Sequence, residues 1–159
     1  MNLPLLSCRP AARMQRPPTC PVLAGWPNRY LVITAPARAN RVGALRRRLA
    51  ALLTDWGIIA EDVDSAVLVA DELLANSAVH GRSRMELAVG LDRRGLRIAV
   101  TDYGKPQRTQ KDTDSYDADE HGRGMTIVTT LTTHSIIHQG PWGRCICVIM
   151  SGIRTPPLA

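Results

Sequence analysis

Apolar residues recur every three or four positions through two segments in the first half of the chain, which is the spacing of a helix that buries one face. In the first segment they are Val42, Leu45, Leu49, Leu52, Leu53 and Trp56. Pro36 suits the first turn of this helix, where no amide hydrogen is needed, and Gly57 suits its end. A second helix is predicted from Glu61 to Val79, with acidic residues in its first turn, where the helix dipole favours negative charge.

Apolar and polar residues alternate in other segments, as they do in strands that bury one face. Tyr30–Thr34 is predicted to form a strand before the first helix. Met85–Val89 and Leu96–Val100 are predicted to form a hairpin, because Asp92-Arg93-Arg94-Gly95 between them is typical of a tight turn. The remaining predicted elements are a helix from Gly122 to about Leu131 and strands near Ser135–Ile137 and Cys145–Ile149. Together they predict an α/β two-layer sandwich, in which helices cover one face of a mixed β-sheet.

The length of 159 residues and the 45% hydrophobic content are enough for one core and one domain. Residues 1–27 carry six prolines and no periodic apolar pattern, which predicts a disordered leader. The folded domain is therefore expected at residues 28–151, with a short tail at 152–159, and Met14 is an alternative start to Met1. No apolar run approaches the roughly 20 residues that span a bilayer, so we expect a cytoplasmic protein without a membrane segment.

The formal net charge of +6 raises the question of nucleic acid binding. The basic residues are scattered, and Arg46, Arg47 and Arg48 point in three directions from one helix rather than forming a stripe. Three Trp, three Tyr and no Phe leave few side chains on which bases could stack. A solvated surface or an acidic protein partner is therefore favoured and no nucleic acid is expected, with a basic nucleic-acid-binding domain kept as an alternative.

The four cysteines and four histidines show no spacing typical of a zinc site or a disulfide framework. Cys145 and Cys147 alternate within one predicted strand, so they share a face but lie too close along the strand to bridge comfortably. We predict that both are buried thiols.

Three short motifs carry the candidate chemistry. Glu72 and Asn76 lie one helical turn apart on the same face, where a carboxylate and an amide oxygen could hold a hydrated cation or a water. A solvated helix edge is the alternative. Asp102 and Gly104 follow a predicted strand, where side chains reach into a loop, although both are also ordinary turn residues. Gly122-Arg123-Gly124 opens the third predicted helix and could offer free backbone N–H groups to phosphate, or serve only as a flexible loop.

The order of these motifs resembles that of the Bergerat-fold ATPases, the superfamily of gyrase B subunits, heat-shock chaperones, histidine kinases and MutL proteins. Within it, the chain is most similar to the small stand-alone serine/threonine kinases of the anti-sigma-factor type. Glu72–His80 resembles their N box, Asp102-Tyr103-Gly104 the start of their first glycine box, and Gly122–Met125 their second. The resemblance extends from about Asn28 to about Met150.

This resemblance implies ATP and Mg²⁺ as cofactors. It makes Asn76 the magnesium ligand and Glu72 the catalytic base that orients or deprotonates the attacking hydroxyl. It makes Asp102 the acceptor for the exocyclic amine of adenine, while Gly104 lets the backbone approach the ring. The remaining implied nucleotide contacts come from the second glycine box, namely Gly122, Arg123, Gly124 and Met125.

The implied activity is phosphorylation of a serine or threonine on a small regulatory partner, an anti-sigma-factor antagonist. The resemblance adds a sigma factor as a further partner and leaves a homodimer open. The alternative is a non-catalytic module of the same fold that sequesters a transcription-regulatory partner, with or without nucleotide.

Two departures from the family pattern bear on this choice. Lys105-Pro106 follows Gly104, where a second glycine is usual, and stiffens the expected hinge of the lid. Arg144-Cys145 stands where relatives often carry a threonine that supports the adenine-binding aspartate. The lid itself is expected at Gln107–Glu120, an acidic stretch without periodicity that is predicted to be mobile in the absence of nucleotide.

Overall fold

The computed structural model describes residues 29–80, 83–104 and 118–155, with the side chains of 118–123 excluded. These residues form five strands and three helices. In chain order they are β1 (Arg29–Pro36), α1 (Ala39–Asp55), α2 (Ala60–His80), β2 (Arg84–Asp92), β3 (Gly95–Tyr103), α3 (Ala118–Leu131), β4 (His134–Gly140) and β5 (Gly143–Met150). The predicted leader at 1–27 and residues 107–117 of the predicted lid lie outside the described residues.

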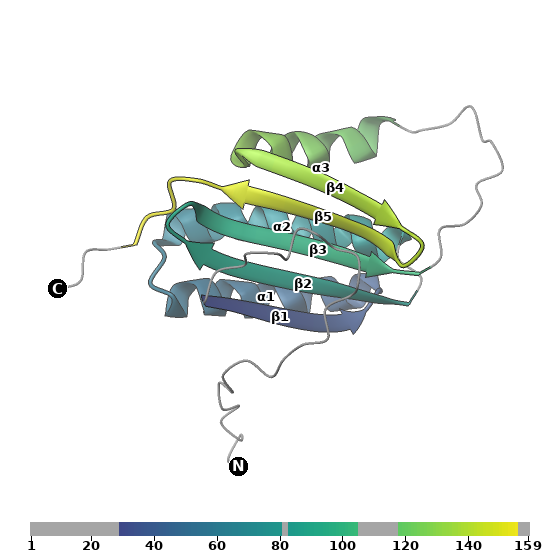
Figure 1. The fold of residues 1–159 in the computed structure, drawn as a ribbon, viewed down its shortest axis with the longest axis horizontal. Coiled ribbons are helices and arrows are strands. Elements are labelled where there is room, and N and C mark those ends of the chain that lie inside the picture. Colours follow the sequence, from purple (N-terminus) through teal and green to yellow (C-terminus); the bar gives the residue numbers. More distant parts are fainter. Residues whose placement is uncertain (1–28, 81–82, 105–117, 156–159) are drawn as a thin grey trace, which may run out of the picture.

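The strands form one sheet in the order β1-β2-β3-β5-β4, and the helices lie on one face of it (Figure 1). This arrangement confirms the predicted two-layer α/β sandwich. The expectation of a mixed sheet is corrected in one respect, because every described strand pair is antiparallel. The crossover through α3 makes β4 run parallel to β3, but β5 folds back between them and pairs with both. No parallel neighbours result within the described sheet.

Two predicted element boundaries are wrong. Pro36 ends β1 opposite Arg84 and does not begin the following helix, which starts at Ala39. The edge position of β1 explains why the strand accepts a residue without an amide hydrogen. The third helix begins at Ala118 rather than at Gly122.

A single apolar core fills the space between the helices and the sheet. Its fully buried side chains come from both layers: Leu49, Leu53, Val69, Leu73 and Leu74 from the helices, and Met85, Leu87, Leu96, Ile98 and Val148 from the sheet. A smaller cluster lies on the opposite sheet face, where Cys145 and Cys147 pack with Ala88 and Ala99. Both cysteines are buried thiols, as predicted.

Hydrogen bonds join the residues after β5 to the start of α2. The Arg154 backbone N–H donates to the Asp62 carboxylate over 2.6 Å, and its guanidinium donates to the same carboxylate over 2.8 and 3.2 Å. The side-chain hydrogen bonds from Arg154 hold the pKa of Asp62 below its usual value. Because this folded-state pKa is depressed, the pair stabilises the fold at neutral pH and loses that contribution as the pH falls through it.

Gly143 lies at the start of β5, where the β4–β5 hairpin meets β3, and a substitution there tests the packing of the sheet. Its φ of 139° disfavours an L side chain, and a Cβ there would overlap the backbone carbonyl of Asp102. We expect Gly143→Ala to lower the free energy of unfolding by about 3 kcal/mol or more, measured by denaturant unfolding. Gly57→Ala is the matched control, since its φ is 75° but nothing lies within 4 Å of its Cβ. Gly57→Ala should lower the free energy of unfolding by only about 1–2 kcal/mol, the cost of a side chain on a left-handed backbone. Equal losses at both glycines would contradict this account.

Candidate functional site

The first and third sequence motifs meet where α3 packs against α2. Glu72 and Asn76 are half-buried and one turn apart on α2. Gly124 of α3 is buried, and a Cβ at this position would overlap the end of the Glu72 carboxylate. Only a residue without a side chain therefore leaves the Glu72 carboxylate in its place. Glu72 and Gly124, which are 52 positions apart in the chain, therefore bring the two motifs into contact.

Asp102 belongs to the face of β3 that the helices cover. It pairs with core residue Met85 on β2, and α2 packs against β3. One carboxylate oxygen of Asp102 accepts a hydrogen bond from the backbone N–H of Arg144 over 3.1 Å. Burial raises the pKa of Asp102, and the N–H of Arg144 and the charges of Arg144 and His80 oppose that rise. The result is a half-buried, oriented acceptor at the end of a strand.

One of the two departures from the family pattern concerns the residue that supports Asp102. The expected threonine is absent, but Arg144 stands directly opposite Asp102 in the β3–β5 pairing and supplies its main-chain N–H instead. Sequence reasoning missed this role because a backbone donor does not depend on which side chain the residue carries. It also missed His80, whose charge acts on Asp102 from the last turn of α2.

The second glycine box lies inside α3 rather than before it. Gly122 is the fifth residue of α3, so its N–H belongs to the helical hydrogen-bond ladder and is not one of the four free donors at the helix start. The prediction that Gly122-Arg123-Gly124 opens the helix is therefore wrong. Met125 follows them as a half-buried residue packed against the core.

Gly104 leaves β3 with a φ of 147°, in a backbone region that favours glycine. Its N–H donates to the carbonyl of Trp142 in the β4–β5 turn over 3.1 Å. Gly104 is thereby fixed to the neighbouring hairpin, directly before Lys105 and Pro106, which lie outside the described residues.

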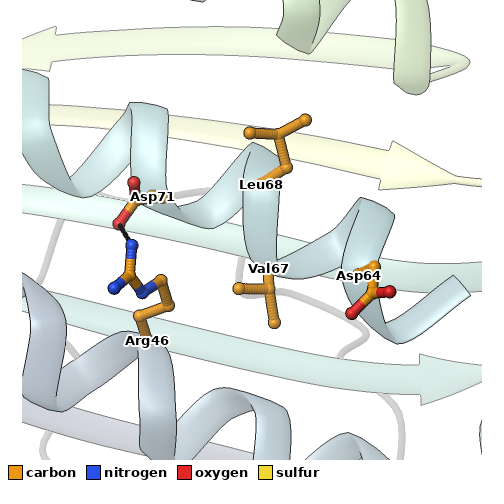
Figure 2. Close-up of a pocket in the computed structure, with 5 residues that line it drawn as sticks. All are labelled: Arg46, Asp64, Val67, Leu68 and Asp71. Carbon is orange, nitrogen blue, oxygen red and sulfur yellow. Dashed lines mark ion pairs between the residues drawn. The ribbon is translucent and has the colours of Figure 1, made fainter. Parts of the chain in front are cut away.

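Asp71 points away from this site. Its carboxylate lies 3.5 Å from the guanidinium of Arg46 on α1, across a groove between the two helices that Val67 and Leu68 also line (Figure 2). Consecutive residues of a helix lie about 100° apart, so Asp71 and Glu72 face in different directions.

In the part of the chain that the structure describes, the site has no acidic cage for a metal ion. Among the described residues no group of three His, Cys, Asp or Glu side chains could hold one. Asn76, with one amide oxygen, fits an ion that takes its remaining ligands from a bound phosphate and water.

Within the residues that the structure describes, no helix is long and apolar enough to cross a membrane.

The sequence and the fold were compared with those of known proteins. The sequence profile described as the histidine kinase-like ATPase domain matches residues 35–150. The chain belongs to the histidine kinase-like ATPase domain family. This ATPase domain is similar in fold to the crystal structure of the RsbU and RsbW domains of Rv1364c from Mycobacterium tuberculosis, with a TM-score of 0.59 and 20% identity. The match covers 79% of the chain but only 32% of that structure, so the chain spans about a third of its length. No curated protein matches the sequence.

The contact between Gly124 and Glu72 predicts an unusual pair of effects for Gly124→Ala. Alanine favours the helix by about 1 kcal/mol over glycine, and the flexible end of Glu72 can move aside. The free energy of unfolding should therefore change by less than about 1 kcal/mol, while the Glu72 carboxylate is displaced. Denaturant unfolding and the carboxyl ¹³C resonance of Glu72 measure the two effects.

Gly43→Ala is the matched control, because its Cβ would meet only the Arg47 side chain at an ordinary 3.5 Å. It should stabilise the protein and leave the Glu72 resonance in place. A Glu72 resonance that is unchanged in Gly124→Ala would show that the contact is absent.

Proposed function

We propose that this protein is an ATP-dependent protein serine/threonine kinase that acts on a small regulatory partner in the cytoplasm. The observation that carries the proposal is the contact of Gly124 with Glu72, which joins the second glycine box to the N box. Asp102 lies on the same helix-covered side of the sheet as an oriented acceptor. Family membership implies ATP binding, and these residues are the ones that the motifs assign to it.

The nucleotide is bound by residues from three elements. The carboxylate of Asp102 accepts a hydrogen bond from the exocyclic amine of adenine, and the backbone at Gly104 lies along the ring. The residues that the family resemblance assigns to the phosphates are Gly122, Arg123, Gly124 and Met125. Asn76 would hold Mg²⁺, which would neutralise part of the phosphate charge.

Glu72 acts in the transfer itself. Its carboxylate orients the hydroxyl of a serine or threonine of the partner and accepts its proton. The hydroxyl oxygen forms a bond to the γ-phosphorus while the bond from that phosphorus to the bridging β–γ oxygen breaks, and ADP leaves with the electron pair. The missing side chain at Gly124 leaves room for the carboxylate beside α3, and a positioned base requires that this space stays free.

The partner that fits the sequence resemblance is an anti-sigma-factor antagonist, with a sigma factor as a second partner. The similar structure names an RsbW domain, at an identity that carries the fold alone. A second candidate function is a binding module that sequesters its partner without phosphorylating it. The Lys105-Pro106 departure favours this candidate, because it stiffens the segment where the lid begins.

Nucleotide binding is tested by thermal unfolding with Mg-ATP. At a ligand concentration a hundredfold above its dissociation constant, the stabilisation should be about 2.7 kcal/mol. Asn76→Ala should lose most of it, because the amide oxygen no longer holds the ion. A wild-type protein whose melting temperature is unmoved by millimolar Mg-ATP and Mg-ADP would contradict the proposal.

Catalysis is tested by transfer of labelled phosphate to the antagonist-like protein of the same genome. Glu72→Ala should bind Mg-ATP and the partner almost normally, while its transfer rate falls by about 10²- to 10⁴-fold, the usual range for loss of a positioned base. Asp71→Ala is the control, since its exposed ion pair with Arg46 lies outside the site, and its rate should not change. If the wild type binds ATP and partner but labels no serine or threonine, the sequestering module replaces the kinase.

A further inference from the structure

Strand β3 ends with two neighbouring residues on opposite faces of the sheet. Asp102 is on the face that the helices cover, whereas Tyr103 is on the other face, since consecutive side chains of a strand alternate. The two residues share a peptide unit, so a restraint on the ring of Tyr103 also limits how the backbone at Asp102 can turn.

The ring of Tyr103 is held on both sides. The guanidinium of Arg84, on the paired residue of β2, lies 4.2 Å from the ring centroid. The ring of Trp142 lies 6.3 Å away at a tilt of 53°. Only 9% of Tyr103 is exposed. Cation–π and tilted aromatic contacts of this kind favour one orientation of the ring.

The hydroxyl of Tyr103 is also bound. It donates a hydrogen bond to the carboxylate of Glu86, a charged residue of which 6% is exposed. Burial, together with the nearby Glu86 carboxylate, raises the pKa of Tyr103 to about 12, so the phenol stays a neutral donor at physiological pH. The donor and the acceptor therefore satisfy each other inside a largely buried cluster.

The main chain around Tyr103 is fixed as well. The side chain of Ser83 donates to the Tyr103 carbonyl over 2.8 Å, and the N–H of Gly104 donates to the Trp142 carbonyl over 3.1 Å. Trp142 thus contacts both the ring of Tyr103 and the residue that follows it. The cluster surrounds the point at which β3 leaves the sheet.

We propose that Tyr103 is a positioning residue for the nucleotide site: its ring, clamped by Arg84, Glu86 and Trp142 on the outer face, orients the Asp102 carboxylate toward adenine on the opposite face. The proposal rests on the proposed function. It makes the outer-face cluster a determinant of base selectivity, because a carboxylate that is held in place accepts from the amine of adenine and meets the carbonyl oxygen of guanine unfavourably.

The test compares Tyr103→Leu, Tyr103→Phe and the wild type in ATP and GTP titrations. Tyr103→Leu should weaken ATP binding by about tenfold and reduce the ratio of ATP to GTP affinity, because Asp102 is no longer held in one orientation. Tyr103→Phe retains the ring between Arg84 and Trp142 and should restore most of the selectivity. Leu96→Ala, at the other end of β3, is the control for a core defect in the same strand, and its selectivity should match the wild type.

Hydrogen exchange without nucleotide separates this proposal from the proposed function. The amide of Arg144, which donates to Asp102, should exchange faster in Tyr103→Leu and at the wild-type rate in Leu96→Ala. A wild type that binds no ATP overturns the proposed function, and the Arg144 amide still decides whether Tyr103 positions Asp102. A folded Tyr103→Leu protein with unchanged Arg144 exchange, or with unchanged ATP to GTP selectivity, overturns the positioning role.

Discussion

The packing of α2 against the sheet, with α1 on one side of it and α3 on the other, is the constraint on which the rest of the site depends. Its apolar residues face the core, which sets the rotation of the helix and therefore the direction of Glu72 and Asn76. The approach of α3 is limited at Gly124, where a side chain would occupy the space of the Glu72 carboxylate. Burial of the core and placement of the site residues thus follow from the same helix, and a shift of either neighbour would move the carboxylate.

The end of β3 also positions site residues, and it does so mostly through main-chain contacts. Asp102 is held by the N–H of Arg144, and Gly104 by the carbonyl of Trp142. Both contacts come from the β4–β5 hairpin, so the register of β5 against β3 places the acceptor. Burial raises the pKa of Asp102, while the hydrogen bond from Arg144 and the charges of Arg144 and His80 lower it, so a main-chain donor orients a half-buried carboxylate.

Much of this fold could be predicted from the sequence, because apolar periodicity and turn residues are local signals. The helix from Ala60 to His80 follows from such patterns to within one residue at each end, and the strands of the β2–β3 hairpin to within three. The misses arise where tertiary context decides. Pro36 is a strand residue because an edge strand tolerates it, and β5 separates β3 from β4 because the last hairpin folds back between them.

The sequence likewise predicted some features of the candidate site and missed others. The residues of the N box were recognisable as a motif, and helical spacing already separated Glu72 from Asp71. The contact of Gly124 with Glu72, the support of Asp102 by Arg144 and the clamp on Tyr103 could not be foreseen, since each joins segments that are distant in sequence through backbone groups or through packing on the far face of the sheet.

The most direct test of the central claim is the mapping of Mg-ATP onto backbone amide resonances by NMR. Binding at the junction of α2, α3 and β3 should shift the amides of Asn76, Gly124 and Arg144, and should leave those around Asp64 and Leu68, in the groove between α1 and α2, in place. Shifts confined to that groove, or none at saturating Mg-ATP, would contradict the account.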